Sequence, residues 1–142
     1  MTKWTKPSDR FKQDLEPALA DYTNDPLCER KANILASAID RHCDWTYVYL
    51  RDTNPSRLGD AKNEKQFLRQ LLPQCQPLQI MNELSDAYHH RELTKPSNPA
   101  RLITESTAAY SVQDGALHIQ KWKKPFLPEA ITAVDFWRNF KD

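Results

Sequence analysis

Side chains suited to acid–base chemistry gather near the end of one apolar-periodic segment. The stretch "SDAYHHRELTKP", residues 85–96, places His89, His90 and Arg91 next to one another just before a proline. His42 lies in an earlier and longer segment of the same kind. A neutral histidine can act as a general base, and an arginine can stabilise an anion that develops during a reaction. His42, His90 and Arg91 are therefore the candidate catalytic residues.

The helical period indicates which side chains of the longer segment face the core. Each helical residue turns the chain by about 100°, so His42 falls in the middle of an apolar sector within residues 26–50. Asp40 and Asp44 fall on the opposite side and are expected to face solvent or a partner. The apolar sector consists of Leu27, Ile34, Leu35, Ala38, Trp45 and Tyr49.

The same arithmetic divides the later segment. Arg91 falls in its apolar stripe, whereas Asp86, His89 and His90 share the opposite face. Two interpretations of the inward side remain open. Either His42 is a core histidine and Arg91 reaches the helix end, or the two meet across the seam between their helices as base and anion stabiliser. The outward residues form either a solvated surface pair or a contact surface. The predicted contact surface consists of Asp40, Asp44, Asp86, His89 and His90.

No motif for a metal or a cofactor is present, and neither is expected. Histidines at H-x-x-x-H or H-E-x-x-H spacing do not occur, and adjacent histidines diverge on a helix. The chain has only two glycines and no glycine-rich phosphate loop. Cys28, Cys43 and Cys75 are odd in number and lack C-x-x-C spacing, and the opening "MTKWTKPSDR" lacks an apolar core. These features predict a cytoplasmic chain with reduced thiols and no membrane span.

Two short basic clusters each hold a tryptophan. "KWTK" covers residues 3–6, and "KWKK" consists of Lys121, Trp122, Lys123 and Lys124. Lysine charge combined with tryptophan stacking suits single-stranded nucleic acid, whereas a strand end with solvated lysines around a core tryptophan explains the same pattern. The net charge of +1 gives no global attraction to nucleic acid. RNA is therefore a candidate partner only through such a local surface.

Prolines delimit the predicted helices that must position these residues. Ser8 is the expected N-cap of a first helix, which Pro17 interrupts. The longest helix is predicted to run from Asp25 as cap and Pro26 as first residue to about Leu50. Two shorter helices are predicted over residues 64–73 and 77–93.

The pattern changes after residue 100. β-Branched residues flank an Asp114-Gly115 turn, and Leu117 and Ile119 alternate with polar neighbours, which predicts a β-hairpin. A last amphipathic helix is predicted over residues 128–140, with an apolar stripe formed by Ile131, Val134, Trp137 and Phe140.

These elements predict a mainly α protein with a single domain over residues 1–142. A bundle of four to five helices occupies residues 1–95, and the β-hairpin and closing helix occupy residues 100–142. A composition of 39% hydrophobic and 27% charged residues is sufficient for a globular core without disulfides.

Residues 26–95 resemble the HEPN superfamily, in particular small bacterial HEPN-like proteins. The resemblance is carried by "ERKANILASAIDRHCDWTYVYL" and by "FLRQLLPQCQPLQIMNELSDAYHHRELT". It implies an α-helical bundle that commonly dimerises. The superfamily includes metal-independent ribonucleases of toxin, CRISPR and antiphage systems, and also non-catalytic binding modules.

The ribonuclease motif that the resemblance implies is altered in this chain. The motif has an arginine, a polar neighbour and a histidine four to six residues later, whereas this chain has Asn82 ahead of His89 or His90. An asparagine cannot hold and neutralise a scissile phosphate as a guanidinium does. Arg91 or Arg41 would have to supply that charge from elsewhere.

These observations favour a non-enzymatic, HEPN-like interaction module. We expect it to be bacterial, linked to nucleic acid or to antiphage or toxin-type systems, and to act as a homodimer or with another protein. One alternative is a metal-independent ribonuclease that uses His42 or His90 with Arg91. Another is a protein inhibitor or immunity protein.

Overall fold

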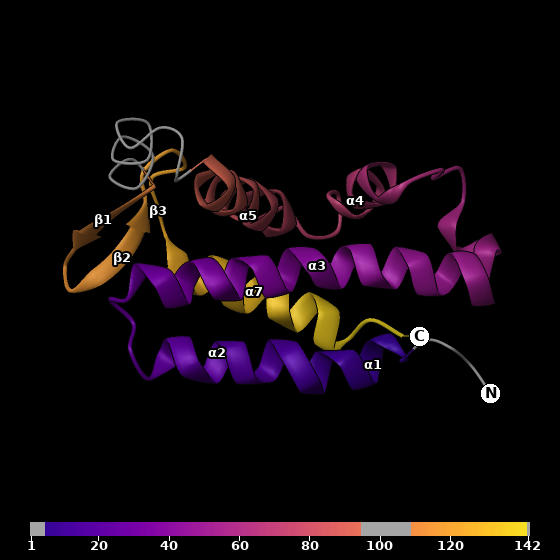
Figure 1. The fold of residues 1–142 in the computed structure, drawn as a ribbon, viewed down its shortest axis with the longest axis horizontal. Coiled ribbons are helices and arrows are strands. Elements are labelled where there is room, and N and C mark those ends of the chain that lie inside the picture. Colours follow the sequence, from indigo (N-terminus) through magenta and orange to yellow (C-terminus); the bar gives the residue numbers. More distant parts are fainter. Residues whose placement is uncertain (1–4, 95–108, 142) are drawn as a thin grey trace.

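The long helix α3, Glu29–Thr53, runs through the middle of the protein (Figure 1). The computed structural model describes residues 5–94 and 109–141, with the backbone alone for residues 90–94. Helices α1 and α2 lie antiparallel to α3 along one side, and α4 and α5 lie along another (Figure 1). The C-terminal helix α7 packs against both α3 and α5.

A short π-helix interrupts the N-terminal helical layer. Pro17 lacks an N–H and its ring crowds the carbonyl four residues earlier, so a regular α-turn cannot pass through it. The chain widens just before this proline, and the N–H of Glu16 bonds to the carbonyl of Phe11, five residues back. The predicted interruption thus occurs as a change of helix type. Ser8 is not the cap, because Lys6 holds the N-cap position without a side-chain hydrogen bond. The layer consists of α1, Pro7–Arg10, η1, Phe11–Leu15, and α2, Glu16–Thr23.

The long helix starts later than its sequence predicts. Asp25 and Pro26 belong to the turn after α2, and Cys28 is the N-cap of α3. The hydroxyl of Tyr22 donates to the carbonyl of Pro26 at 2.7 Å, and the N–H of Cys28 donates to the carbonyl of Asp25 at 3.1 Å. These two bonds hold the segment in a turn, so it cannot form the first turn of the helix.

The prolines and the Asn63 cap place the next elements close to their predicted positions. Asn63 caps α4 by accepting a hydrogen bond from the backbone N–H of Gln66 at 2.9 Å. Pro77 is the first residue of α5, as predicted. The elements here are the 3₁₀-helix η2, Pro55–Leu58, then α4, Glu64–Leu71, and α5, Pro77–Thr94.

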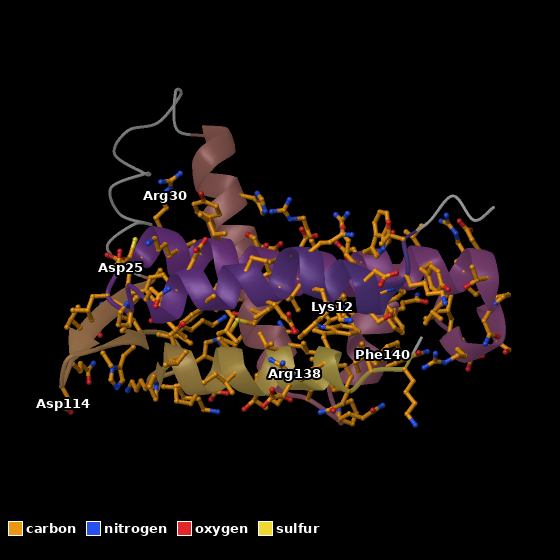
Figure 2. All side chains as sticks on the ribbon, turned by 90° about the horizontal axis from the view of Figure 1, so that it is seen from below. Lys12, Asp25, Arg30, Asp114, Arg138 and Phe140 are labelled. Atoms are coloured by element: carbon orange, nitrogen blue, oxygen red, sulfur yellow. The ribbon has the colours of Figure 1, made fainter. Side chains whose placement is uncertain are left out.

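The predicted β-hairpin is confirmed. Asp114 and Gly115 have φ angles of +52° and +74°, which is the left-handed pair that a tight two-residue hairpin turn requires. Asp114 lies at the tip of the hairpin (Figure 2). A third strand was not predicted, and it makes the sheet three-stranded and antiparallel in the order β1-β2-β3. The strands are β1, Tyr110–Gln113, β2, Ala116–Ile119, and β3, Lys124–Pro125.

The closing helix α7, Phe126–Arg138, begins two residues earlier than predicted. Val134 and Trp137 are buried, as its apolar stripe predicts, but Ile131 is 39% exposed and Phe140 lies beyond the helix end. The mainly α fold with a C-terminal hairpin and closing helix is confirmed. Within the parts of the chain that the structure describes, no helix has the length and apolar character needed to cross a bilayer.

One buried hydrogen bond attaches the hairpin to the bundle. The hydroxyl of Tyr110 on β1 donates to Oδ1 of Asn33 on α3 at 2.8 Å, and both residues are buried. Asn33 is seven residues before Asp40 and so lies on the same polar side of α3, and the hairpin that covers it explains its burial.

Tyr110→Phe should lower the free energy of unfolding by about 1–2 kcal/mol, because it leaves the Asn33 side-chain oxygen buried without this donor. Val112→Ala on the same strand is the matched control. Val112 is 60% exposed, so this change should cost under about 0.5 kcal/mol. Urea denaturation of the two variants and the wild type measures both values, and equal stabilities would contradict the role of the bond.

Candidate functional site

A polar seam joins α3 to α5. The side-chain amide of Asn82 donates to Oδ1 of Asp40 at 2.9 Å, and the hydroxyls of Ser37 and Ser85 lie 3.3 Å apart. The prediction that Asp40 faces solvent or a partner is therefore wrong, since the residue is half-buried against α5. Because α3 is covered on two sides, part of its polar face also has to pack.

The predicted apolar sector of α3 is only partly buried. Leu35 and Tyr49 are buried, but Leu27 and Ile34 are 48% and 39% exposed. Leu27 precedes the first residue of the helix, and Ile34 borders a cavity between α3 and the N-terminal layer.

The outward orientation predicted for Asp86 and His89 is confirmed, because both are exposed. Although exposed, the ring of His89 also contacts the polar seam, because its Nε2 lies 3.3 Å from the hydroxyl of Ser37. The side chains of His90 and Arg91 lie outside the described residues, so their roles stay predictions. His42 is on the face of α3 opposite the seam, since a helical step of two residues from Asp40 turns the chain by about 200°.

Carboxylates from three helices surround a cleft beside the seam. Asp44 on α3, Glu64 on α4 and Asp86 on α5 line a cavity of about 430 Å³, which we call the acidic cleft. Glu64 was not predicted as part of any site, because nothing in the sequence indicates that α4 folds back onto this face of α3. The other lining residues are Lys65, Leu68, Arg69, Gln79 and Asn82.

The electrostatics of the acidic cleft disfavour a charged Asp44. Partial burial, followed by the negative charges of Asp40, Glu64 and Asp86, raises the pKa of Asp44 from 3.8 to about 6. Burial also raises the pKa of Asp40, against the bond from Asn82 that lowers it. Within the described residues, no group of three or more His, Cys, Asp and Glu side chains is arranged to hold a metal ion. The cleft instead offers carboxylate oxygens to a positively charged hydrogen-bond donor.

His42 lies in an aromatic environment on the other face of α3. It is 3% exposed, and its ring centroid lies 6.2 Å from Phe11 of η1 and 4.8 Å from Trp137 of α7. Burial, followed by the charge of Arg10, lowers the pKa of His42 from 6.5 to about 4. The prediction that His42 points inward is confirmed, and its imidazole is neutral at pH 7.

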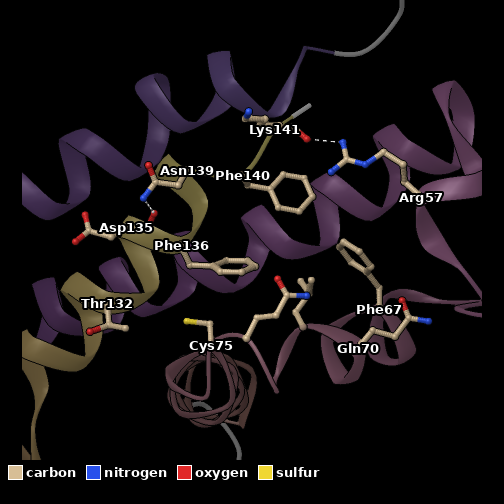
Figure 3. A pocket seen from close by; sticks show the side chains of 12 residues that line it. Arg57, Phe67, Gln70, Cys75, Thr132, Asp135, Phe136, Asn139, Phe140 and Lys141 are labelled. Atoms are coloured by element: carbon tan, nitrogen blue, oxygen red, sulfur yellow. Dashed lines mark hydrogen bonds between the residues drawn. The ribbon is translucent and has the colours of Figure 1, made fainter.

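A cavity of about 870 Å³ lies between α4 and the C-terminal end of α7 (Figure 3). The rings of Phe136 and Phe140 face into it, and Cys75 lies at its base (Figure 3). Arg57 stacks on Phe140, with its guanidinium carbon 4.9 Å from the ring centroid, and also donates to the carbonyl of Lys141. No sequence motif marked this cavity, because its residues come from segments that are distant along the chain.

The predicted basic surface at residues 121–124 is largely engaged within the protein. Lys121 pairs with Glu83 of α5, and Lys124 lies 3.4 Å from Glu129 of α7. Trp122 is half-buried and packs against the core. This arrangement matches the alternative of a strand end around a core tryptophan. The other basic cluster, which includes Trp4, lies largely outside the described residues.

Comparisons with known proteins do not extend this chemistry. No protein-family model, no curated protein and no solved structure matches the chain. The function therefore has to be argued from the clefts themselves.

His42→Phe should weaken the dependence of stability on pH. Because the pKa of His42 is about 4 in the folded state and 6.5 is its ordinary value, the unfolded chain takes up a proton first as the pH falls. The contribution of neutral His42 to the free energy of unfolding is therefore complete above pH 6.5 and is lost as the pH falls toward 4. Between pH 7 and pH 5 the wild type should lose about 2 kcal/mol more than the variant, measured by urea denaturation. Equal losses would show that His42 is not held neutral.

Proposed function

We propose that this chain is a non-catalytic protein-interaction module whose acidic cleft receives a lysine or arginine side chain of a partner. The observation that carries the proposal is the convergence of Asp44, Glu64 and Asp86 from three separate helices on one cavity. Partial burial first, and then the like charges around it, raise the pKa of Asp44, so both effects disfavour its charged form in the folded protein. A cation bound between the three carboxylates would offset their repulsion and add charge-assisted hydrogen bonds.

The cations at the edge of the cleft do not perform this role within the chain. Lys65 and Arg69 line the same cavity. Among the described side chains, however, the ion pairs found include none between either of them and Asp44, Glu64 or Asp86. Asp44 and Asp86 are both exposed, so a side chain from another molecule has access to both.

The arrangement of the nucleophilic groups supports binding over catalysis. The hydroxyl of Ser37 lies 3.3 Å from Nε2 of His89, which is the spacing of a nucleophile and its base. Ser37 is 0% exposed, so a substrate has no access to it. Cys43 is also buried, and burial raises the pKa of its thiol well above 9.0. The ribonuclease alternative rests on His42 or His90 with Arg91, and buried His42 is poorly placed for it.

The class of partner follows from the sign of the charge. A basic protein surface complements the acidic cleft, whereas RNA would bring phosphates against carboxylates. A non-catalytic module of this kind agrees with the binding members of the HEPN superfamily. A second copy of the chain is the alternative partner, and a mass that rises with concentration toward twice 16.6 kDa would indicate it.

Asp44→Asn should stabilise the folded protein and weaken binding at the same time. At pH 7 the variant should gain about 0.5–1 kcal/mol in the free energy of unfolding, since it removes a partly solvated carboxylate from three like charges. Because the pKa of Asp44 is raised to about 6, the wild type regains this stability as the pH falls from 6 toward 4, and the two proteins should converge there. Binding of an octalysine peptide at low salt should weaken roughly fivefold, measured by isothermal titration calorimetry.

Asp114→Asn is the matched control for this experiment. It removes the same charge at the tip of the hairpin, and asparagine tolerates the φ of +52° found there. It should change octalysine affinity little. Equal weakening by the two variants would show that the peptide responds to net charge and not to the cleft. Cleavage of RNA in EDTA by the wild type, abolished by His90→Ala, would replace the proposal with the ribonuclease alternative.

A further inference from the structure

A third cavity lies on the face of α3 that carries His42. It has a volume of about 230 Å³ and lies between α3 and the N-terminal layer, and we call it the His42 cavity. One part of its wall is apolar and consists of Leu15, Ala18, Ile34 and Ala38. The other part is polar and consists of Arg10, Asp14, Arg41 and His42. This division suits a ligand with one charged end and an apolar body.

The imidazole that lines this cavity has an unsatisfied nitrogen. His42 is 3% exposed, yet its Nδ1 has no hydrogen-bond partner among the described residues. Buried polar atoms are paired in the great majority of cases, and an unpaired one destabilises the folded state. Because Nδ1 also has almost no accessible surface, an anion in the cavity acts on the imidazole through its charge and not through a bond to this atom.

The charges around the cavity favour an anion. Two guanidinium groups, Arg10 and Arg41, line it against one carboxylate, Asp14. Arg10 is held in place, since its Nε lies 2.8 Å from Asp14 and its guanidinium carbon lies 4.4 Å from the ring centroid of Trp45. Arg41 is exposed, and the ion pairs found among the described side chains do not involve it. Its positive charge is therefore available at the cavity.

We propose that the His42 cavity binds a small molecule in which a carboxylate is joined to an apolar body. Arg41, aided by Arg10, binds the carboxylate, whose negative charge then lies next to the neutral imidazole of His42. The apolar body packs against Leu15 and Ile34, which accounts for an isoleucine that is 39% exposed beside a polar wall. This site is separate from the acidic cleft, lies on the opposite face of α3, and stands or falls independently of the proposed function.

Benzoate is a suitable probe, because it joins a carboxylate to a compact apolar ring. Titration of the full chain at pH 7 and low salt, followed by NMR of the imidazole nitrogens, should give a saturable shift of His42. The negative charge next to the ring should also raise the pKa of His42 above its value of about 4 in the unliganded protein. Benzamide has the same shape without the charge, and inorganic phosphate has charge without the apolar body. Both should bind at least about tenfold more weakly.

Arg41→Gln should weaken benzoate binding about tenfold, since it removes a charged hydrogen-bond donor. Arg30→Gln is the matched control, because it removes the same charge from an exposed position on the same helix. Arg30 is eleven residues, about 16 Å, from Arg41 along α3, and it lies toward the end of the molecule that carries Asp25 (Figure 2). Both substitutions are at exposed positions, so both proteins should keep the wild-type circular dichroism spectrum.

Three outcomes would overturn the proposal. The first is the absence of a saturable His42 shift up to a high benzoate concentration, which would indicate that benzoate does not enter the cavity. The second is equal weakening by Arg41→Gln and Arg30→Gln, which would indicate attraction to net charge. The third is binding of benzamide as tightly as benzoate, which would indicate a purely apolar cavity.

Discussion

Helix α3 is packed from two opposite sides, and the rest of the structure depends on that constraint. Polar groups on such a helix have to find their hydrogen-bond partners inside the protein. The hydroxyl of Tyr110 donates a hydrogen bond to Asn33, and the side-chain amide of Asn82 donates one to Asp40. Each bond joins α3 to a different element, so together they fix the rotation of the helix about its axis. That rotation decides which side chains reach each cleft.

The two faces of α3 carry opposite chemistry. On one face, partial burial and then the neighbouring carboxylates raise the pKa of Asp44. On the other face, burial and a neighbouring guanidinium lower the pKa of His42. At both sites the folded protein disfavours the charged form of a side chain that would be well hydrated in water. A ligand whose charge is opposite to that of the residues around the site would offset this effect. A single long helix thereby separates a carboxylate-lined surface from a guanidinium-lined one by its own diameter.

Local signals in the sequence predict the elements well, whereas the surfaces depend on contacts that the sequence does not show. The hairpin follows from Asp114 and Gly115, whose φ angles are both positive, and α5 begins at its proline. The face of α3 was harder to assign, because helical period separates apolar from polar residues but does not reveal that a second layer covers the polar side. Asp40 was therefore predicted to face solvent or a partner, although Asn82 of the same chain bonds to it. The residues that line the acidic cleft, the His42 cavity and the cavity beside Phe140 come from several distant elements. No spacing along the chain indicates that they come together.

The π-helix at Phe11–Leu15 is equivalent to an α-helix with one residue inserted. Deleting one residue there would restore the α-helical register and turn everything on the N-terminal side by about 100°. Phe11 and Arg10, which now lie beside His42, would rotate away from it, while the helices themselves could still form. The shape of the His42 cavity thus depends on the number of residues in the π-helix before Pro17 as well as on their chemistry. In evolutionary terms, a single insertion or deletion in this segment would create or remove a binding site without changing the fold.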